Sequence, residues 1–261
     1  MNRFLSCIWC STALLLTMKL ASDDGYLDRH RVYAGPEEYH VKRTKKGGTI
    51  QNGYLFGVRA GYDRLKRYGW YIGAEAAYAG GVLKGHTGGD AKLKSRYYEG
   101  SVEGRAGYTF QQKEGFQCAL TPFIGGGYSV ERNNFKDPSP LPIHFRTHYG
   151  FVSAGFLSSV RWNDRWTTGI NFKARLPMEP RCAVSHDPDN EPVTQNIRER
   201  VQYRVELPIT CALSCDWEWS VGLVPFYDYK PYGSHPNFPF DFIKTRYSCW
   251  GATLEFQMNL M

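Results

Sequence analysis

The sequence lacks most of the features by which a helical membrane protein, a metal enzyme or a nucleic-acid-binding protein is recognised. After the first twenty residues no apolar run approaches the roughly 20 residues that a membrane-spanning helix needs, and Leu-rich helical stretches are missing. The cysteines that follow residue 21 form no CxxC motif and no Cys/His ligand set, so we expect no metal and no cofactor. The formal net charge is +7, but the basic residues are scattered and matched by many acids, which argues against nucleic acid as a partner.

What the chain does contain is aromatic residues and glycine. Its 261 residues include 18 Tyr, 15 Phe, 7 Trp and 27 Gly, and no break in composition divides them into two domains. Aromatic and β-branched side chains suit the pleated surface of a strand. The composition therefore favours a single all-β domain.

The start of the chain has the organisation of a secretory signal peptide. Arg3 gives it a positive end, residues 4–18 are mostly apolar, and small residues follow where cleavage would occur. We expect residues 1–21 to be removed, residues 22–30 to form a short periplasmic segment and residues 31–261 to form the folded domain. A retained N-terminal anchor is the alternative.

Export would also permit a disulfide bond. Cys211 and Cys215 flank a tight turn and are the pair that we expect to be bonded. Free buried thiols are the alternative, and the number of cysteines after residue 21 is odd, so at least one thiol stays unpaired within the chain.

Alternation of apolar and polar residues with a period of two is the strongest pattern in the chain, and it indicates strands with two different faces. Within residues 96–110, Tyr98 and Val102 lie on one face and Glu103 and Arg105 on the other. Clear and weaker copies of the pattern predict strands at 31–42, 50–63, 70–80, 96–110, 116–132, 145–162, 165–176, 198–210, 217–229 and 244–258. We therefore predict an antiparallel up-and-down transmembrane β-barrel of about ten strands, within a range of about eight to twelve.

The predicted connections alternate in length. Short turns are expected at 64–69, 111–115, 163–164 and 212–216, and longer segments, which hold most of the prolines and histidines, at 81–93, 133–144, 177–196 and 230–242. Short turns at one end and long loops at the other are typical of barrels that cross a membrane. We expect both termini to lie on the periplasmic side and the long loops to lie outside.

Two features favour a membrane barrel over a soluble one. Aromatic residues recur near both ends of strands, as Tyr54 and Tyr62 do, at the spacing expected for rings at the two headgroup levels. The polar faces carry both signs of charge, which an enclosed lumen tolerates when the charges are paired and hydrated. The predicted lumen network consists of Arg59, Asp63, Glu75, Glu99, Glu103, Arg105, Lys173, Arg175, Arg200, Arg204, Glu206, Glu218 and Glu255. The solvated surface of a soluble periplasmic barrel is the alternative.

The C-terminal strand carries the most specific motif. Gly251, Leu254 and Phe256 resemble the sorting signature at the end of Gram-negative outer-membrane barrels, although Cys249 stands where that signature has a polar residue and the chain continues to Met261. By pattern, residues 31–261 are similar to small outer-membrane barrels of the OmpA/OmpX-like kind. The resemblance implies the outer membrane of a Gram-negative bacterium, with membrane lipid, lipopolysaccharide and the barrel-assembly machinery as partners.

A ten-stranded barrel is narrow, and long charged side chains would fill it. We therefore expect a largely plugged lumen and a structural or surface-interaction role, in adhesion or envelope integrity, without enzymatic activity. A narrow pore is one alternative. Another is a membrane hydrolase, since similarly sized barrels include omptin-like proteases and lipid hydrolases. The residue types that such chemistry needs are supplied by Ser185, His186, Asp187, Asp189, His144 and His148.

Overall fold

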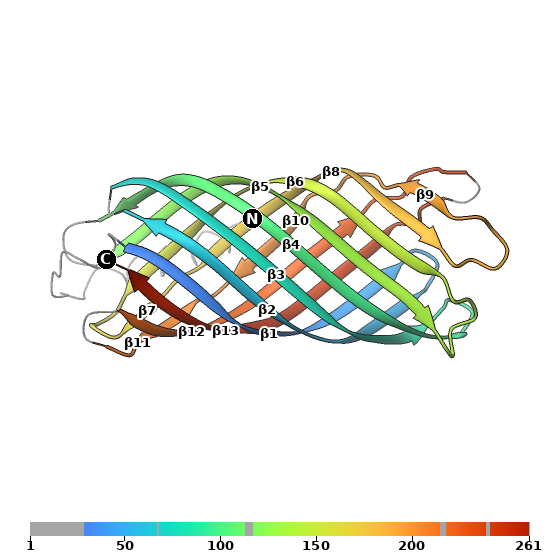
Figure 1. Cartoon of the computed structure of the whole chain (residues 1–261), viewed down its shortest axis with the longest axis horizontal. Helices are drawn as coiled ribbons and strands as arrows, with labels where there is room; N and C mark the ends of the chain where they lie inside the picture. Colours follow the sequence, from blue (N-terminus) through green and yellow to red (C-terminus); the bar gives the residue numbers. More distant parts are fainter. Residues whose placement is uncertain (1–28, 67, 113–116, 215–217, 239–240, 261) are drawn as a thin grey trace, which may run out of the picture.

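The computed structural model describes residues 29–66, 68–112, 117–214, 218–238 and 241–260. They form one antiparallel sheet that closes on itself (Figure 1), because β1 (Arg29–Lys45) pairs with β13 (Thr245–Leu260) from His30 and Leu260 to Lys45 and Thr245. The predicted signal peptide and most of segment 22–30 lie outside the described residues. The predicted all-β closed barrel is confirmed.

We call each strand position around the barrel a wall, whether one strand or several short ones fill it. Six of the walls are single long strands that follow one another around the barrel. They comprise β1 and then β2 (Ile50–Leu65), β3 (Gly69–His86), β4 (Lys92–Gln111), β5 (Cys118–Lys136) and β6 (His144–Arg161). Each pairs with the next in register, and β12 (Trp219–Tyr232) joins β13 in the same way.

The two walls between β6 and β12 are interrupted. One consists of β7 (Trp166–Thr168) and β8 (Asn171–Ser185), and the other of β9 (Val193–Asn196), β10 (Gln202–Glu206) and β11 (Ile209–Ala212). Backbone hydrogen bonds continue across the gaps, since the Gly169 N–H donates to the Pro208 carbonyl at 3.0 Å and the Leu207 N–H to the Pro225 carbonyl at 2.9 Å. Counted in this way, the described residues form the ten walls that the sequence predicts.

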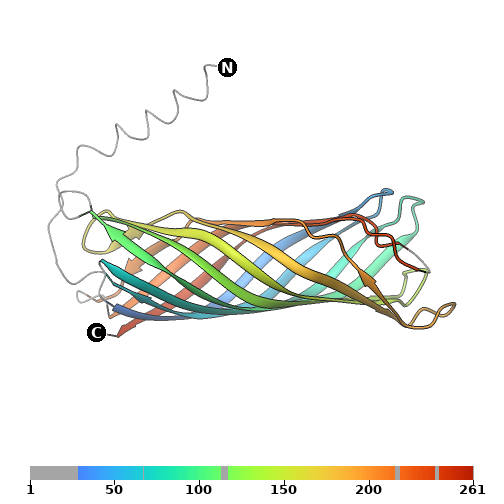
Figure 2. The ribbon, with the colours of Figure 1, turned by 90° about the horizontal axis from the view of Figure 1, so that it is seen from above.

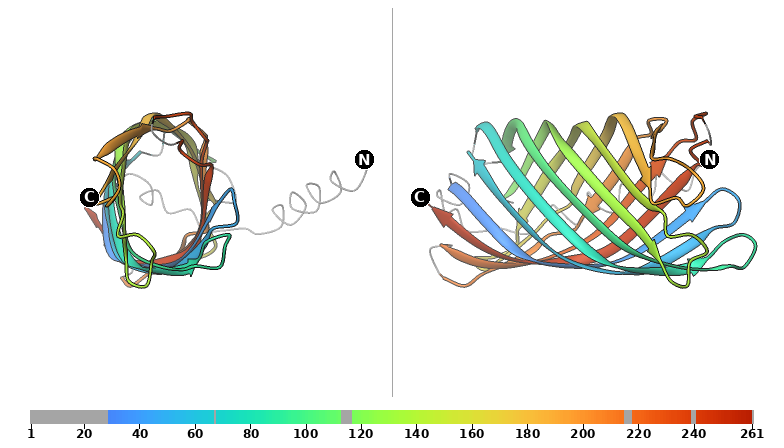
Figure 3. Two further views of the ribbon diagram at one scale, coloured as in Figure 1. Left: turned by 90° about the vertical axis from the view of Figure 1, so that its right-hand side faces the viewer. Right: turned by 45° about the vertical axis from the view of Figure 1, so that its right-hand side comes forward.

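The strands run obliquely along an elongated barrel, as Figure 2 shows, and enclose an elliptical ring when seen from the end (Figure 3). β1 begins and β13 ends at the same end of the barrel, on the left in Figure 1. We call this the terminal end and the opposite one the far end. In the described part of the chain, no helix has the length and apolar character needed to cross a bilayer.

The two faces of the sheet have opposite chemistry. Along β4, Val102 and Tyr108 point outward and are exposed, whereas Glu103 and Arg105 point inward and are buried. Alternate residues of a strand face opposite sides, so one register places a whole row outside and the next row inside. Apolar residues cover the outside of the barrel, and charged residues fill its centre.

Aromatic residues form two rows on the outer face. Each of four strands contributes one ring to each row: Tyr54 and Tyr62 on β2, Trp70 and Tyr78 on β3, Tyr98 and Tyr108 on β4, and Trp219 and Tyr227 on β12. The most exposed of these rings, Trp70, is 73% accessible. The segment from one ring to the other on each strand matches the roughly 9–11 residues of a tilted strand that crosses a bilayer, with the rings at its two interfaces.

The predicted long loops are wrong in one respect: half of their residues continue the strands. Segment 81–93 lies largely in β3, which runs to His86, and in β4, which begins at Lys92. The far-end connections that remain are 46–49, 87–91, 137–143, 186–192 and 233–244. β3 and β4 have 18 and 20 residues, about twice what a bilayer requires, so the barrel wall itself extends beyond the aromatic row at the far end.

The residues of the C-terminal signature lie on β13. Leu254 and Phe256 point outward with the apolar row, and Gly251 faces the neighbouring strand. A Cβ at Gly251 would collide with the carbonyl oxygen of Glu38, so only glycine allows β1 to approach β13 this closely.

Candidate functional site: the lumen

The centre of the barrel is filled by ion pairs that join strands on different walls. Lys173 on β8 places its Nζ 2.6 Å from Glu103 Oε2 and 3.3 Å from Glu75 Oε1, which belong to β4 and β3. Glu75 also forms an ion pair with Arg59, whose Nη1 lies 2.8 Å from Glu75 Oε1. All four side chains are buried, and mutual pairing is what makes buried charges tolerable.

A second group of ion pairs surrounds Arg204 on β10. Its guanidinium reaches Glu206 at 2.7 Å, Glu37 on β1 at 3.4 Å and Asp228 on β12 at 3.6 Å. Glu37 in turn accepts a hydrogen bond from Arg59 Nε at 2.7 Å and from Thr253 Oγ1 at 2.8 Å. Arg59 therefore links this group to the one around Lys173.

A third contact crosses the full width of the lumen. Lys230 on β12 donates to both oxygens of Glu99 on β4, at 2.9 and 2.8 Å. In the order of the ten walls these two strands lie opposite one another. Tyr39 and Tyr97 also donate to Glu99, at 2.6 and 3.0 Å. The carboxylate is thus held from three sides.

The spaces left within the ion pairs are small. The void beside Arg204 and Lys230 has a volume of about 30 Å³, and that between Arg105 and Lys173 about 10 Å³. A single water molecule requires about 10–15 Å³ on the same measure. These two voids can therefore hold isolated waters but have no room for a hydrated solute.

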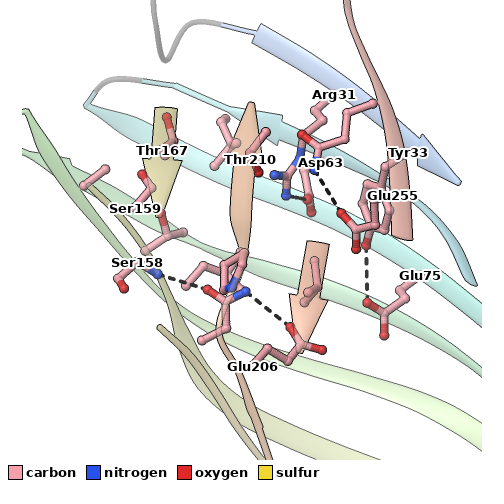
Figure 4. Close-up of a pocket in the computed structure, with 18 of the residues that line it drawn as sticks. Arg31, Tyr33, Asp63, Glu75, Ser158, Ser159, Thr167, Glu206, Thr210 and Glu255 are labelled. Carbon is pink, nitrogen blue, oxygen red and sulfur yellow. Dashed lines mark hydrogen bonds and ion pairs between the residues drawn. The ribbon is translucent and has the colours of Figure 1, made fainter. Parts of the chain in front are cut away.

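A pocket of about 90 Å³ lies on the terminal-end side of the ion pairs (Figure 4). Arg31 pairs with Asp63 on one of its walls, and the Tyr33 hydroxyl donates to Glu75 at 3.3 Å. On the opposite wall Asn171 accepts from the Ser158 N–H and donates to Glu206, both at 3.2 Å.

The structure brings most of the predicted network residues together in the lumen. They are Arg59, Asp63, Glu75, Glu99, Glu103, Arg105, Lys173, Arg175, Arg204, Glu206 and Glu255. Arg175 contacts Glu103 at 3.7 Å, and Arg105 contacts Asp63 at 3.4 Å.

Two predicted members do not lie in the lumen. Arg200 is exposed in the irregular stretch between β9 and β10. The inward-pointing residues are odd-numbered before this stretch, as at Gln195, and even-numbered after it, as at Gln202. Glu218 is exposed in the terminal-end turn before β12. Both predictions are wrong because they extended a strict period of two across a break or past a strand end.

Sequence reasoning missed other members of the network. Arg31 and Glu37 lie on β1, and Asp228 and Lys230 on β12. On both strands the inward row mixes charged and apolar residues, for example Phe226 beside Asp228, so the alternation that identified β4 is obscured.

The inward-pointing tyrosines were also missed, and they line a second, larger cavity at the far end, which we call the vestibule. It has a volume of about 330 Å³. Tyr97, Phe145, Val184 and Tyr247 form apolar parts of its wall. The vestibule is also lined by Arg43, Lys45, Glu131, Asn133, Asp187, Asn190, Tyr232, Asp241 and Phe242.

The candidate hydrolase residues lie at the far-end rim. Ser185 Oγ is 3.1 Å from His186 Nδ1, and the rings of His144 and His186 lie 4.1 Å apart. The Asp187 carboxylate accepts from the Asp189 N–H at 3.0 Å and from Asn190 Nδ2 at 3.3 Å, within its own turn. The hydroxyl–imidazole contact is therefore present. A catalytic triad also requires a carboxylate that contacts the imidazole, and among the described residues none does.

His148, the other rim histidine, points outward on β6 opposite Arg181. Cys211 carries a free thiol, and Cys215, its predicted disulfide partner, lies outside the described residues. Within the described ranges no group of three or more His, Cys, Asp or Glu side chains is arranged to hold a metal ion.

No protein-family model and no curated protein matches the sequence. Among solved structures, the outer membrane protease OmpT from Escherichia coli aligns with a TM-score of 0.55 and 9% identity, over 90% of this chain and 98% of that one. The attachment invasion locus protein Ail of Yersinia pestis aligns with a TM-score of 0.38 and 8% identity, over 89% and 100% of the two chains. OprG from Pseudomonas aeruginosa aligns with a TM-score of 0.37 and 11% identity, over 90% and 96%.

The likeness to OmpT extends over nearly the whole of both barrels and agrees with the closed antiparallel ring and its apolar outer face. At this level of identity it concerns the fold, which is the one expected from the C-terminal signature and the alternating strands. In its fold, this chain is an outer-membrane β-barrel.

Proposed function

We propose that the protein is a sealed outer-membrane barrel with a structural or surface-interaction role, in adhesion or envelope integrity. The observation that carries the proposal is the set of ion pairs across the lumen, above all Lys230–Glu99 and Lys173–Glu103. They connect different walls, and the voids among them have volumes of about 30 and 10 Å³, with the pocket of about 90 Å³ on their terminal-end side. A barrel braced in this way is suited to presenting its far end rather than to bulk transport.

The proposed location is the outer membrane of a Gram-negative bacterium, after removal of the signal peptide. The terminal end then faces the periplasm and the far end the outside. Leu254 and Phe256, in the outward row of β13, are available to the barrel-assembly machinery before the barrel closes on β1.

Lipopolysaccharide is the proposed partner of the outer wall. Above the far-end aromatic row, outward-facing cations lie side by side on neighbouring strands, a surface that we call the basic belt. It consists of Lys84, Lys94, Arg96, Arg132, Lys136, Arg146 and Arg181. In the register Lys84 faces Lys94, and Arg132 faces Arg146. Like charges this close favour a dense anionic partner, as phosphorylated headgroups are.

We also propose that the protein is not an enzyme. In support, the Asp187 carboxylate is occupied by its own turn, and Ser185 and His186 are adjacent residues at an exposed rim. General acid–base catalysis needs partners held in position around a substrate site. A hydrolase assay on membranes that contain a His186→Ala variant tests this directly, because loss of an activity in that variant alone would contradict the proposal.

The experiment that tests the sealed lumen is electrical. The purified barrel, reconstituted in a planar bilayer, is expected to show no steady conductance, and liposomes that contain it are expected not to swell in isotonic arabinose. A Lys230→Ala, Glu99→Ala double variant, which removes the contact across the lumen, serves as the matched comparison. Steady, large conductance of the unaltered protein would overturn the proposal in favour of a pore.

A further inference from the structure

The vestibule is a cavity of a different kind from the voids among the ion pairs. Its volume of about 330 Å³ is within the range of small-molecule binding sites. Connections 186–192 and 233–244 contribute Asp187, Asn190 and Phe242 to its lining at the far end. On the other side Tyr232 and Glu131, joined by a 2.7 Å hydrogen bond, adjoin the ion pairs that close the lumen. The vestibule is therefore a dead end that is entered from the far end.

Two cations of β1 point into this cavity without an acidic partner. Arg43 Nη1 donates to the neutral amide of Gln51 at 2.7 Å, and its guanidinium lies 5.6 Å from the centre of the Tyr247 ring. Lys45 Nζ lies 4.9 Å from the centre of the Phe145 ring. Neither side chain forms an ion pair with any residue in the described part of the chain, whereas the cations deeper in the lumen do.

The surroundings of Lys45 disfavour its charged form. Burial, and then the neighbouring Arg43, lower the pKa of the Lys45 ammonium to about 7. Two adjacent like charges away from water are unfavourable unless an anion joins them. An anion between them would satisfy both.

The acids of the vestibule do not fill that role, because each is held elsewhere. Glu131 accepts from the Tyr232 hydroxyl, and Asp187 accepts from its own turn. Asp241 accepts from the Asn237 N–H at 3.0 Å. The Arg43 and Lys45 charges are the ones left without a counter-ion.

An independent observation points to a ligand in the same cavity. Asn133 on β5 is only 3% exposed and lines the vestibule, yet neither its amide nitrogen nor its amide oxygen has a hydrogen-bond partner. The Nε of Arg43 is likewise buried and unpartnered. Buried polar groups in native proteins are almost always paired, so exceptions that converge on one cavity require an explanation.

We infer that the vestibule is a binding site for a small organic anion with a flat, apolar body. The anionic group lies between Arg43 and Lys45, where both cations donate to it. The body of the ligand packs against the rings of Tyr97, Phe145 and Tyr247, and a polar edge meets the Asn133 amide. This inference is separate from the proposed sealed lumen, because the residues that line the vestibule can bind such a molecule whether or not the barrel conducts.

The test uses the whole mature barrel in detergent and two fluorescent probes of the same shape. 2-Naphthoate carries the anionic group, and 2-naphthamide replaces it with a neutral one. Binding is followed by equilibrium dialysis for the unaltered protein and for Arg43→Gln, Lys45→Gln and Asn133→Ser variants. Lys42→Gln is the control, because Lys42 precedes Arg43 on β1 but points outward and is exposed. Altered mobility on gels before and after boiling verifies that each variant has folded.

We expect one naphthoate per barrel, bound about tenfold more weakly after either Arg43→Gln or Lys45→Gln, since a hydrogen bond to a charged group contributes roughly that factor. Asn133→Ser weakens binding less, and Lys42→Gln leaves it unchanged. Naphthamide binds at least about tenfold more weakly than naphthoate to the unaltered protein. Absence of saturable naphthoate binding up to about 1 mM, equal affinity for naphthamide, or unchanged affinity in folded Arg43 and Lys45 variants would each overturn the inference.

Discussion

Replacing Lys173 with methionine removes one charge from the most connected part of the lumen. The Lys173 side chain is 7% exposed and holds Glu103 at 2.6 Å and Glu75 at 3.3 Å. Breaking a buried pair by removing one partner typically costs about 3–5 kcal/mol, because the remaining charge is left uncompensated. Glu75 keeps Arg59, and Glu103 keeps Arg175, so we expect the lower end of that range.

A destabilisation of about 3 kcal/mol corresponds to roughly a 100-fold fall in the ratio of folded to unfolded protein. Urea unfolding in lipid vesicles, followed by tryptophan fluorescence, measures it. Adding Glu103→Gln to Lys173→Met removes the carboxylate that has lost its nearest cation and should recover about 2 kcal/mol, a coupling typical of contacting residues. Lys84→Met, on the outer wall, should change stability by less than about 0.5 kcal/mol. If Lys173→Met matched this control, or if the second substitution recovered nothing, the interior ion pair would be refuted.

Three further predictions follow from other parts of the barrel. Gly251→Val should slow or prevent closure of β1 on β13, seen as loss of the fast-migrating unboiled form on gels, whereas a normal folded band would contradict the close approach of these strands. Arg132→Gln should weaken lipopolysaccharide binding while Arg64→Gln, at the terminal end, does not; equal effects in a pull-down would refute a role for the basic belt. Burial and the neighbouring His186 lower the pKa of His144, so its NMR titration midpoint should lie below the ordinary value and move upward in His186→Ala. Since the folded state disfavours the protonated ring, protonating His144 as the pH falls should destabilise the rim rather than strengthen it.

The barrel could be predicted from the sequence because its two environments differ so strongly. On β4, Val102 next to Glu103 leaves no doubt about which face is apolar, and the same alternation recurs on enough strands to indicate closure. The spacing of rings such as Trp70 and Tyr78 added the length of the spanning part. These features depend on local sequence and on the thickness of a bilayer, so no tertiary information was needed.

The first strand was harder to predict. Gly35 and Pro36 interrupt its propensity, yet β1 pairs continuously with β2 and keeps one register with β13 on either side of these two residues. Pro36 points outward, and the strand tolerates the lost donor because its neighbours keep the pairing. As a result Glu37, which connects Arg59 with Arg204, was missed from the network.

The far-end half of the lumen could not be predicted from alternation. Tyr39, Tyr97 and Tyr247 point inward, although rings in barrel strands are expected at the membrane interface. A tyrosine can serve either environment, since its ring packs against apolar groups and its hydroxyl donates to a carboxylate, as Tyr97 does to Glu99. The vestibule therefore emerges only once strands distant in sequence are placed around it.

The most direct test of the account is to label the folded barrel from within the bilayer. A hydrophobic diazirine dissolved in the lipid, activated by light and mapped by mass spectrometry, reports which side chains touch hydrocarbon. We predict labelling of Val102 and Ala106 on β4 with Glu103 and Arg105 unlabelled between them, a period of two that recurs on β2 and β3. Labelling of the Glu103 and Arg105 row, or no labelling of this strand by the lipid-borne reagent, would contradict an apolar face in lipid and an ionic face inside.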